Sequence, residues 1–482
     1  MIGVVSYGGY IPRLRLPRMA IMQSMGWFAP GLITVAQGER AFCNWDEDAL
    51  TMAVAAARDC LTGMDKKKVE ALYLGSTSLP YGDRQNAGIL STALNLREDI
   101  FSADVTGSQK AGTGALLVGL EGIQAGEKKS ALVVASDKRE TKSSWFHEMW
   151  FGDAAASLLV GKDNVIAEFK GAHSISCDFV DHFRDAHRKF DYAWEERWIR
   201  DLGYSQILPA AIKGLLDKTG VAIGQVAKLA YPCYFKREHA DIGKKLGAKP
   251  EQLVDNLHEV LGETGVAHPL VQFIGALEGA KPGDKIVLAS FGQGCDALLF
   301  EVTDAIAKLP ARRGIKGSLA NRKVVDNYSK FLKFRDLINT EMGIRAEAER
   351  VNALTVLWRK RKMILGLVGG RCQKCGTRQF PKTEICVNPD CHAHHSQEDC
   401  EFADTPAVVK TFTGDLLAVS VDPPAVYGLI QYHEGGRMMA DFTDCELKDI
   451  KVGLPVSMSF RRRAYDEKRG FTGYFWKAVP QR

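Results

Sequence analysis

Four of the eleven cysteines have a spacing that can hold a metal ion. In the stretch RCQKCGTRQFPKTEICVNPDC, two residues separate Cys372 from Cys375, and four separate Cys386 from Cys391. Two such knuckles can bring four thiolates into the tetrahedron that Zn²⁺ prefers. Because four thiolates leave no open coordination position, we predict a structural zinc site and not a catalytic one.

The histidines His392, His394 and His395 follow the second knuckle and could replace a cysteine ligand, although we expect them to be ordinary loop residues. The remaining seven cysteines are scattered along the chain. An odd set of cysteines in a long chain indicates reduced thiols and a metal site, not a disulfide framework.

A second stretch, VTGSQKAGTGALLVG at 105–119, reads as a polar strand end, a turn of small residues and the start of an apolar helix. Such a turn can present one side chain to a ligand, and backbone N–H groups at a helix start can hold a developing negative charge. Cysteine or serine is the usual nucleophile there, whereas this chain has Ser108, Gln109 and Lys110.

Strand-like and helical patterns alternate up to about residue 305, which predicts an α/β fold with buried sheets. The strand-like runs are 69–76, 131–137, 156–161, 226–235 and 284–290, and the helical patterns are 46–61, 112–125, 206–219 and 270–280. KSALVVASD followed by GDAAASLLVG is similar to DKIVLASFGQGCDALLFEV. This repeat, with a period of about 150 residues, predicts two similar halves with a site where they meet.

The 482 residues are too many for one ordinary core, and four segments differ in character. We expect one α/β half at 1–165, a second half with a strap at 166–345, a helical linker and zinc ribbon at 346–400, and a small barrel of short strands at 401–482.

The net charge of +5 suits an anionic small molecule and does not require a nucleic acid. A zinc ribbon and a small barrel often bind nucleic acid, but this barrel lacks a ladder of aromatic and basic residues, so we expect no nucleic-acid partner. No apolar run approaches the ~18 residues of a membrane span, and no leader pattern opens the chain. We therefore expect a cytoplasmic protein without a membrane partner.

Several segments together resemble 3-hydroxy-3-methylglutaryl-CoA synthase, especially the archaeal type. They are GVVSYGGYIPRLRL, the Gly112-Thr113 helix start, DLGYSQILPAAIKGLLDKTG, IGKKLG and SFGQGCDALLF, and FGDAAAS is similar to a run of the ketoacyl-ACP synthase III enzymes. The resemblance covers roughly residues 1–345 and implies the thiolase fold, two βαβαβαββ halves in five layers, usually as a homodimer. The remainder resembles the zinc-ribbon and OB-fold companion domain of many thiolase-like enzymes.

The resemblance also implies where catalytic residues should lie, because the family uses a cysteine, a histidine and a glutamate. The register places Gln109 at the cysteine and Thr77 at the glutamate, and counting back from Lys244 places Pro232 at the histidine, with Tyr231 and Cys233 on either side. All three catalytic residues are replaced. Since glutamine cannot form an acyl-enzyme, we do not expect Claisen condensation by the family mechanism.

We therefore predict a carbon–carbon lyase that acts on an acyl-CoA, with CoA as part of the substrate. Retro-aldol cleavage of a 3-hydroxyacyl-CoA needs a base and a site that holds the leaving acetyl- or propionyl-CoA enolate, but no nucleophile. Hydrolytic cleavage of a 3-oxoacyl-CoA would use the same site. The catalytic candidates are Gln109, Thr77, Tyr231, Cys233, His239, His268 and Asp296, and the substrate-binding candidates are Ser108, Lys110, Gly112, Arg237 and Gln293.

Two other functions remain open. The chain could be a non-catalytic scaffold that binds CoA esters within a multienzyme complex, which the loss of all three catalytic residues would also predict. It could also be an acyltransferase similar to the synthases with a relocated nucleophile, for which Cys233 is the candidate.

Overall fold

The computed structural model describes residues 1–193, 195–341 and 353–481, and contacts between residues divide the chain into two units. Unit 1 consists of Met1–Cys43, Asp48–Ser91 and Leu96–Leu337. Unit 2 consists of Asn44–Glu47, Thr92–Asn95 and the chain from Ile338 onward. The domain limits expected at 165 and 400 stay predictions, and the limit at 345 lies outside the described residues.

Unit 1 is built on one nine-stranded sheet in the order β11-β12-β13-β8-β1-β7-β6-β4-β5. The first half contributes β1 (Gly3–Tyr10), β4 (Ala71–Gly75), β5 (Phe101–Val105), β6 (Ser130–Lys138) and β7 (Asp153–Gly161). The second half contributes β8 (Ala167–Ser176), β11 (Val226–Ala230), β12 (Lys285–Phe291) and β13 (Gly294–Val302). Within the sheet, the two halves meet where Gly3 and Val4 of β1 pair with Glu168 and Ala167 of β8.

The internal repeat predicted from the sequence corresponds to two antiparallel strand pairs, β6 with β7 and β12 with β13. In each half the first strand of this pair is also parallel to a neighbour, β4 for β6 and β11 for β12. The two halves therefore share one local topology.

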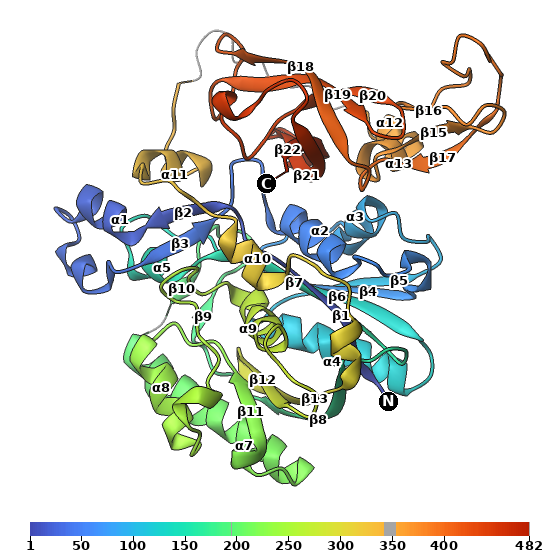
Figure 1. Cartoon of the computed structure of the whole chain (residues 1–482). Coiled ribbons are helices and arrows are strands. Elements are labelled where there is room, and N and C mark those ends of the chain that lie inside the picture. The colour runs from blue at the N-terminus through green and yellow to red at the C-terminus, as the bar shows by residue number, and fades with distance from the viewer. Residues whose placement is uncertain (194, 342–352, 482) are drawn as a thin grey trace. The chain divides into compact units, whose positions relative to one another are not determined.

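Helices lie on both faces of each half (Figure 1). In the centre, α4 (Ala111–Gln124) packs on β4 and β6, and α9 (His268–Leu277) packs on β7, β12 and α4. On the outer faces, α2 (Ala49–Cys60) covers β1, β6 and β7, and α7 (Leu208–Thr219) covers β8, β12 and β13. The five layers are therefore α2, the strands of the first half, the central helices, the strands of the second half and α7. They confirm the thiolase fold that the resemblance implied.

The helix α9 is apolar and buried at nearly every position, whereas α4 buries the side that faces the strands and α9 and leaves Val118 46% exposed. Gly112 in the first turn of α4 permits a close approach, since a Cβ there would lie 2.6 Å from the Val266 carbonyl oxygen before α9. Gly112, expected to bind substrate, therefore has a packing role at the contact between the two halves.

The remaining elements of unit 1 are short. The small sheet β14-β2-β3 joins the chain's beginning to its strap. The strands are β2 (Leu14–Pro17), β3 (Glu39–Phe42), β9 (His182–Phe183), β10 (Tyr192–Ala193) and β14 (Lys323–Val324). The helices are α1 (Arg18–Met25), α3 (Asn86–Ala93), α5 (Phe146–Trp150), α6 (Glu196–Trp198), α8 (Lys236–Lys245), α10 (Gly314–Ala320) and α11 (Tyr328–Phe334).

Unit 2 contains a small zinc-ribbon sheet and a barrel. After α12 (Leu354–Arg359) and α13 (Arg361–Leu365), the sheet β16-β15-β17 consists of β15 (Val368–Cys372), β16 (Arg378–Gln379) and β17 (Gln397–Glu401). The barrel has the order β20-β19-β18-β21-β22, with β18 (Ala407–Asp415), β19 (Ala425–Tyr432), β20 (Arg437–Asp441), β21 (Pro455–Asp466) and β22 (Phe471–Pro480). A bridge from Phe442 to Ala478 connects its two edge strands, and the predicted barrel is confirmed.

The basic helical stretch expected at 306–365 is only partly described, because 342–352 lie outside the described residues. Its described end is tied to the barrel, since the indole Nε1–H of Trp476 in β22 donates to the Leu365 carbonyl oxygen at 2.7 Å. No helix in the described part of the chain has the length and apolar character needed to cross a bilayer.

We predict that Trp476→Phe destabilises unit 2 by about 2 kcal/mol, because a buried carbonyl loses its donor and the smaller ring leaves a void. Calorimetry of the full chain should show a lower midpoint for the transition of unit 2. Trp358→Phe is the control, since Trp358 is 65% exposed and phenylalanine keeps a ring beside Arg361. Equal midpoints for the two variants would contradict the role of this hydrogen bond.

Candidate active site and metal centre

One cavity in unit 1 gathers residues from both halves of the fold. Its free volume is about 30 Å³, which holds one or two water molecules. The start of α4, the end of β6, the segment around β9 and β10, and the loops before α8 and α9 all contribute. The lining residues are Gln109, Arg139, His147, Phe151, Asp181, His182, Asp191, Ala193, Tyr204, Pro232, Tyr234, Glu263, Gly265, Ser290 and Phe291.

Gln109 lies directly before α4 and points its amide at a histidine. Its side-chain nitrogen is 3.2 Å from Nε2 of His182 and 3.5 Å from Oγ1 of Thr77. Its side-chain oxygen is buried and, within the described residues, has no hydrogen-bond partner. The amide therefore offers both a donor and an acceptor at the position that the resemblance assigns to a cysteine.

His182, the first residue of β9, is held by a carboxylate on its other side. Its Nδ1 is 2.9 Å from Oδ2 of Asp181. When Nδ1–H donates to this carboxylate, the lone pair of Nε2 faces the Gln109 amide, which is the tautomer of a general base. Burial alone would lower the pKa of His182, but the carboxylates of Asp181 and Asp191 outweigh that effect and raise it.

The turn that carries Thr77 is fixed by the carboxylate of Asp137 at the end of β6. Asp137 accepts hydrogen bonds from the backbone N–H and the hydroxyl of Thr77, at 2.8 and 3.0 Å, and from the backbone N–H of Val266 at 3.0 Å. Gly265 has a φ of +61°, and a Cβ there would lie 2.5 Å from Asp137 Oδ2. A residue other than glycine would therefore disturb this anchor.

Arg139 is the buried cation of the cavity. Its guanidinium donates to Glu263, lies 3.8 Å from Asp191 and stands 3.7 Å above the ring of Phe151. Burial lowers the pKa of Arg139, but Glu263 and Asp191 outweigh burial and raise it, so the guanidinium stays charged.

Aromatic side chains form the rest of the wall. Tyr204, in the π-helical segment Ile199–Ile207, and Tyr234 have pKa values raised mainly by burial, so their hydroxyls stay protonated. Burial, together with the charge of Arg139, lowers the pKa of His147 to about 4, so this ring is neutral at pH 7. Such groups can donate hydrogen bonds to a ligand without adding charge.

The structure brings together the three positions transferred from the family. Gln109 and Pro232 line the cavity, and Thr77 lies beside Gln109. Ser108 and Lys110 flank Gln109 in sequence and Asp296 contacts Lys110, but none of these three candidates lines the cavity. Ser108 donates to the Gly292 carbonyl at 2.7 Å, while Lys110 and Asp296 form an ion pair at 3.0 Å.

The other candidate bases lie outside the lining and have packing contacts. The Tyr231 hydroxyl donates to the His239 carbonyl at 2.8 Å, and burial raises the pKa of the Cys233 thiol. His268 is buried, accepts the Thr264 N–H at 3.0 Å and has its pKa lowered to about 4 by burial. Catalytic roles for these residues stay predictions, because none of them lines the cavity.

Two substrate-binding candidates also lie outside the lining. Arg237 is exposed on α8, and Gln293 occupies the turn between β12 and β13 with a φ of 54°. The lining residues that sequence reasoning missed are chiefly Asp181, His182, Asp191 and Tyr204. All four come from one polar segment after β8, in which titratable side chains are unusually dense.

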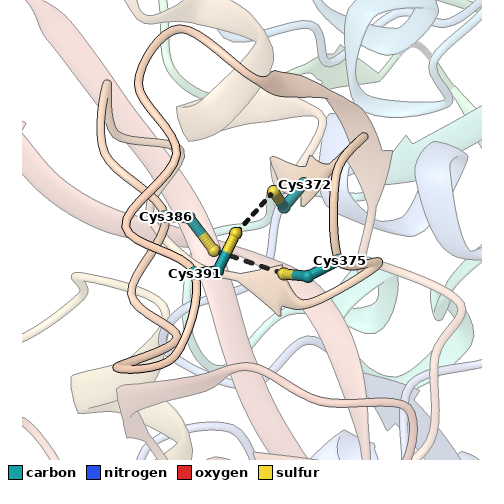
Figure 2. A group of neighbouring side chains, drawn as sticks. All are labelled: Cys372, Cys375, Cys386 and Cys391. Carbon is teal, nitrogen blue, oxygen red and sulfur yellow. Dashed lines mark hydrogen bonds between the residues drawn. The ribbon is translucent and has the colours of Figure 1, made fainter.

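The four predicted cysteine ligands converge in unit 2. Figure 2 shows Cys372, Cys375, Cys386 and Cys391 facing one another, and their sulfur atoms all lie within 4.8 Å. The Cys372–Cys391 and Cys375–Cys386 sulfur distances are 3.9 and 3.6 Å. A tetrahedral zinc with Zn–S bonds of about 2.3 Å needs sulfur separations of roughly 3.8 Å, so the donor set fits this metal.

The metal site needs no histidine, because the described cluster consists of the four cysteines alone. All eleven cysteines lie among the described residues, and none of them forms a disulfide there. Both observations agree with the reduced, metal-binding use of cysteine that the sequence predicted.

Comparisons with known proteins place both units in known classes. Residues 362–395 match the family model "ChsH2, rubredoxin-like zinc ribbon domain" and residues 403–461 match "ChsH2, C-terminal OB-fold domain". A crystal structure of HMG-CoA synthase complexed with CoA has a TM-score of 0.62 at 16% identity, over 73% of this chain and 95% of that one. A 3-oxoacyl-[acyl-carrier-protein] synthase III from Aquifex aeolicus has a TM-score of 0.57 at 17% identity, over 62% and 100%.

These matches define a thiolase-fold protein with a C-terminal zinc ribbon and OB-fold barrel. The hydroxymethylglutaryl-CoA synthase of Caldivirga maquilingensis is 30% identical over 353 residues, which cover 71% of this chain and 99% of the relative. That of Pyrobaculum arsenaticum is 29% identical over 345 residues, covering 70% and 98%. The chain belongs to the hydroxymethylglutaryl-CoA synthase family.

We predict about one zinc ion per purified chain, measured by elemental mass spectrometry. Replacing Cys372 and Cys375 together by serine should abolish it, because two ligands cannot hold the metal in a closed site. Cys400→Ser is the matched control, since Cys400 lies in β17 of the same sheet but outside the cluster. Zinc-free wild-type protein, or a double variant that keeps the metal, would contradict the assignment.

Proposed function

We propose that this chain is a cytoplasmic, homodimeric carbon–carbon lyase that cleaves a 3-hydroxyacyl-CoA by a retro-aldol reaction. Acetyl-CoA or propionyl-CoA leaves together with an aldehyde or ketone. The observation that carries the proposal is the Asp181–His182 pair, whose imidazole faces Gln109 in a cavity where the family's cysteine is absent. The described lining of the site thus contains a base and no cysteine nucleophile.

In this mechanism His182 is the general base. Its Nε2 accepts the proton of the 3-hydroxyl group, the C2–C3 bond breaks, and the oxygen becomes a carbonyl while the electron pair moves into the enolate of the CoA thioester. The imidazolium then returns the proton to C2, so atoms and charges balance. Asp181 holds the imidazole in the productive tautomer and stabilises the imidazolium.

The enolate oxygen is proposed to lie at the start of α4. The backbone N–H of Gln109 donates to no acceptor among the described residues, and the adjacent side-chain amide adds a second donor. Glycine at 292 keeps this space open, because a Cβ there would lie 3.0 Å from the Gln109 nitrogen. Donors fixed before the reaction stabilise a developing oxyanion most effectively.

The alternatives have less support. Among the described lining residues there is no cysteine, and the raised pKa of the buried Cys233 disfavours a relocated nucleophile. If His182 activates a water molecule instead, a 3-oxoacyl-CoA would be hydrolysed to a free acid. In unit 2 the four cysteines are proposed to hold a structural zinc that takes no part in the cleavage.

We expect His182→Gln to lower kcat by about 10²- to 10⁴-fold, because it removes the general base. The assay offers a panel of 3-hydroxyacyl- and 3-oxoacyl-CoA esters and identifies the products by mass spectrometry. His187→Gln is the control, since His187 lies on the same segment but is exposed. A free acid product would favour hydrolysis, while CoA-ester binding without any turnover would favour a scaffold and refute the enzyme.

We also predict that kcat/KM rises with pH through the pKa of His182, because only the neutral imidazole can accept the proton. Asp181→Asn removes the main charge that raises this pKa, so the acidic limb of the profile should move to lower pH. The maximal rate should fall as well, because the amide no longer selects the productive tautomer. An unchanged acidic limb would show that another group titrates.

A further inference from the structure

The cations around the catalytic cavity are already neutralised by carboxylates. Arg139 bonds to Glu263 and lies 3.8 Å from Asp191, and one face of its guanidinium is covered by the ring of Phe151. Its side chain is only 6% exposed. The buried cation of the cavity therefore has two acidic partners and little surface left for a third.

The neighbouring cations are paired in the same way. Arg184 lies 3.6 Å from Asp191 and donates to the Thr77 carbonyl, while Lys110 is paired with Asp296 at 3.0 Å. The remaining group that can be positive, His182, is 2.9 Å from Asp181. No cation of the described lining is left to receive an acidic group of a ligand.

Carboxylates also face the cavity directly, from Asp181, Asp191 and Glu263. A ligand carboxylate placed among them would lose its water and find no ionic partner, because the neighbouring cations are already paired with these acidic side chains. Burying an unpaired charge is strongly unfavourable. Aromatic side chains, by contrast, offer a favourable surface to an uncharged group, and Phe151, Tyr204, Tyr234 and Phe291 line the same cavity.

We infer that the acyl group accepted by this site is uncharged and that Asp191 enforces the choice. This inference rests on the proposed function, because it defines the substrate class of the same cavity. The charge of the site favours a 3-hydroxyacyl-CoA whose acyl end is uncharged, whereas an ester that ends in a carboxylate, such as a glutaryl ester, is rejected. Asp191 is the specificity residue because its carboxylate pairs with the guanidinium groups of both Arg139 and Arg184. Without Asp191, these two positive charges could bind an acidic group of a ligand.

The test compares two CoA esters that lack the 3-hydroxyl group and so cannot undergo retro-aldol cleavage. 3-Methylpentanoyl-CoA and 3-methylglutaryl-CoA differ only in a terminal methyl against a carboxylate. Titration calorimetry with the unmodified protein should show at least about tenfold tighter binding of the uncharged ester, a difference of about 1.4 kcal/mol. Equal affinity, tighter binding of the glutaryl ester, or no binding of either ester would overturn the inference.

Asp191→Asn should reduce the ratio between the affinities for the two esters at least about threefold. The main cause should be stronger binding of 3-methylglutaryl-CoA to the released guanidinium groups. Asp185→Asn is the matched control, because Asp185 is exposed on the same segment and pairs with Arg188, so it should leave the ratio unchanged. If Asp191→Asn does not fold, the ratio measured on the unmodified protein still decides the charge preference. If the chain is not a lyase, the activity assay will show no turnover. The affinity ratio can still be measured in that case, because neither ester is cleaved.

Discussion

The carboxylate of Asp137 is the contact on which the geometry of the site depends. It lies at the end of a central strand and accepts hydrogen bonds from the turn at 76–78, which belongs to the first half, and from Val266, which precedes a helix of the second half. One side chain therefore sets the distance between the halves at the cavity. Thr77, Gln109 and Gly265 take their positions around it, and the catalytic proposal depends on their alignment.

Parts of this molecule could be predicted from local sequence because local spacing determines them. The cysteine knuckles and the alternation of strands and helices follow from neighbouring residues. Local sequence marked the turn before the helix start at Gly112 and Thr113, and the resemblance to the synthases then selected Gln109 within it. His182 could not be found in this way. The segment CDFVDHFRDAHRKFDYA at 177–193 alternates charged and aromatic residues between two-residue strands, so no periodicity indicates which side chains face inward.

The candidate bases chosen from the sequence failed to converge for a similar reason. Asp296 follows a glycine-rich turn, as a catalytic carboxylate often does, yet Lys110 and Thr113 bind it from a helix that lies far away in sequence. His268 precedes a proline and could pass for a surface residue, but it is fully buried and holds the entry to a central helix. The contacts of Asp296 form only when the two halves meet, and those of His268 form only when the loop before α9 has folded.

Gln109 lies beside His182 and affects how readily this imidazole gains and loses a proton. A cysteine in that place can exist as a thiolate, and the resulting ion pair would keep the imidazole protonated. Glutamine is neutral at every pH, and rotation of its amide lets it donate to a neutral imidazole or accept from an imidazolium. Its buried oxygen has no other described partner that would oppose this rotation. In the proposed mechanism, the replacement thus leaves His182 able to take up and release a proton, whereas a thiolate neighbour would hold that proton in place.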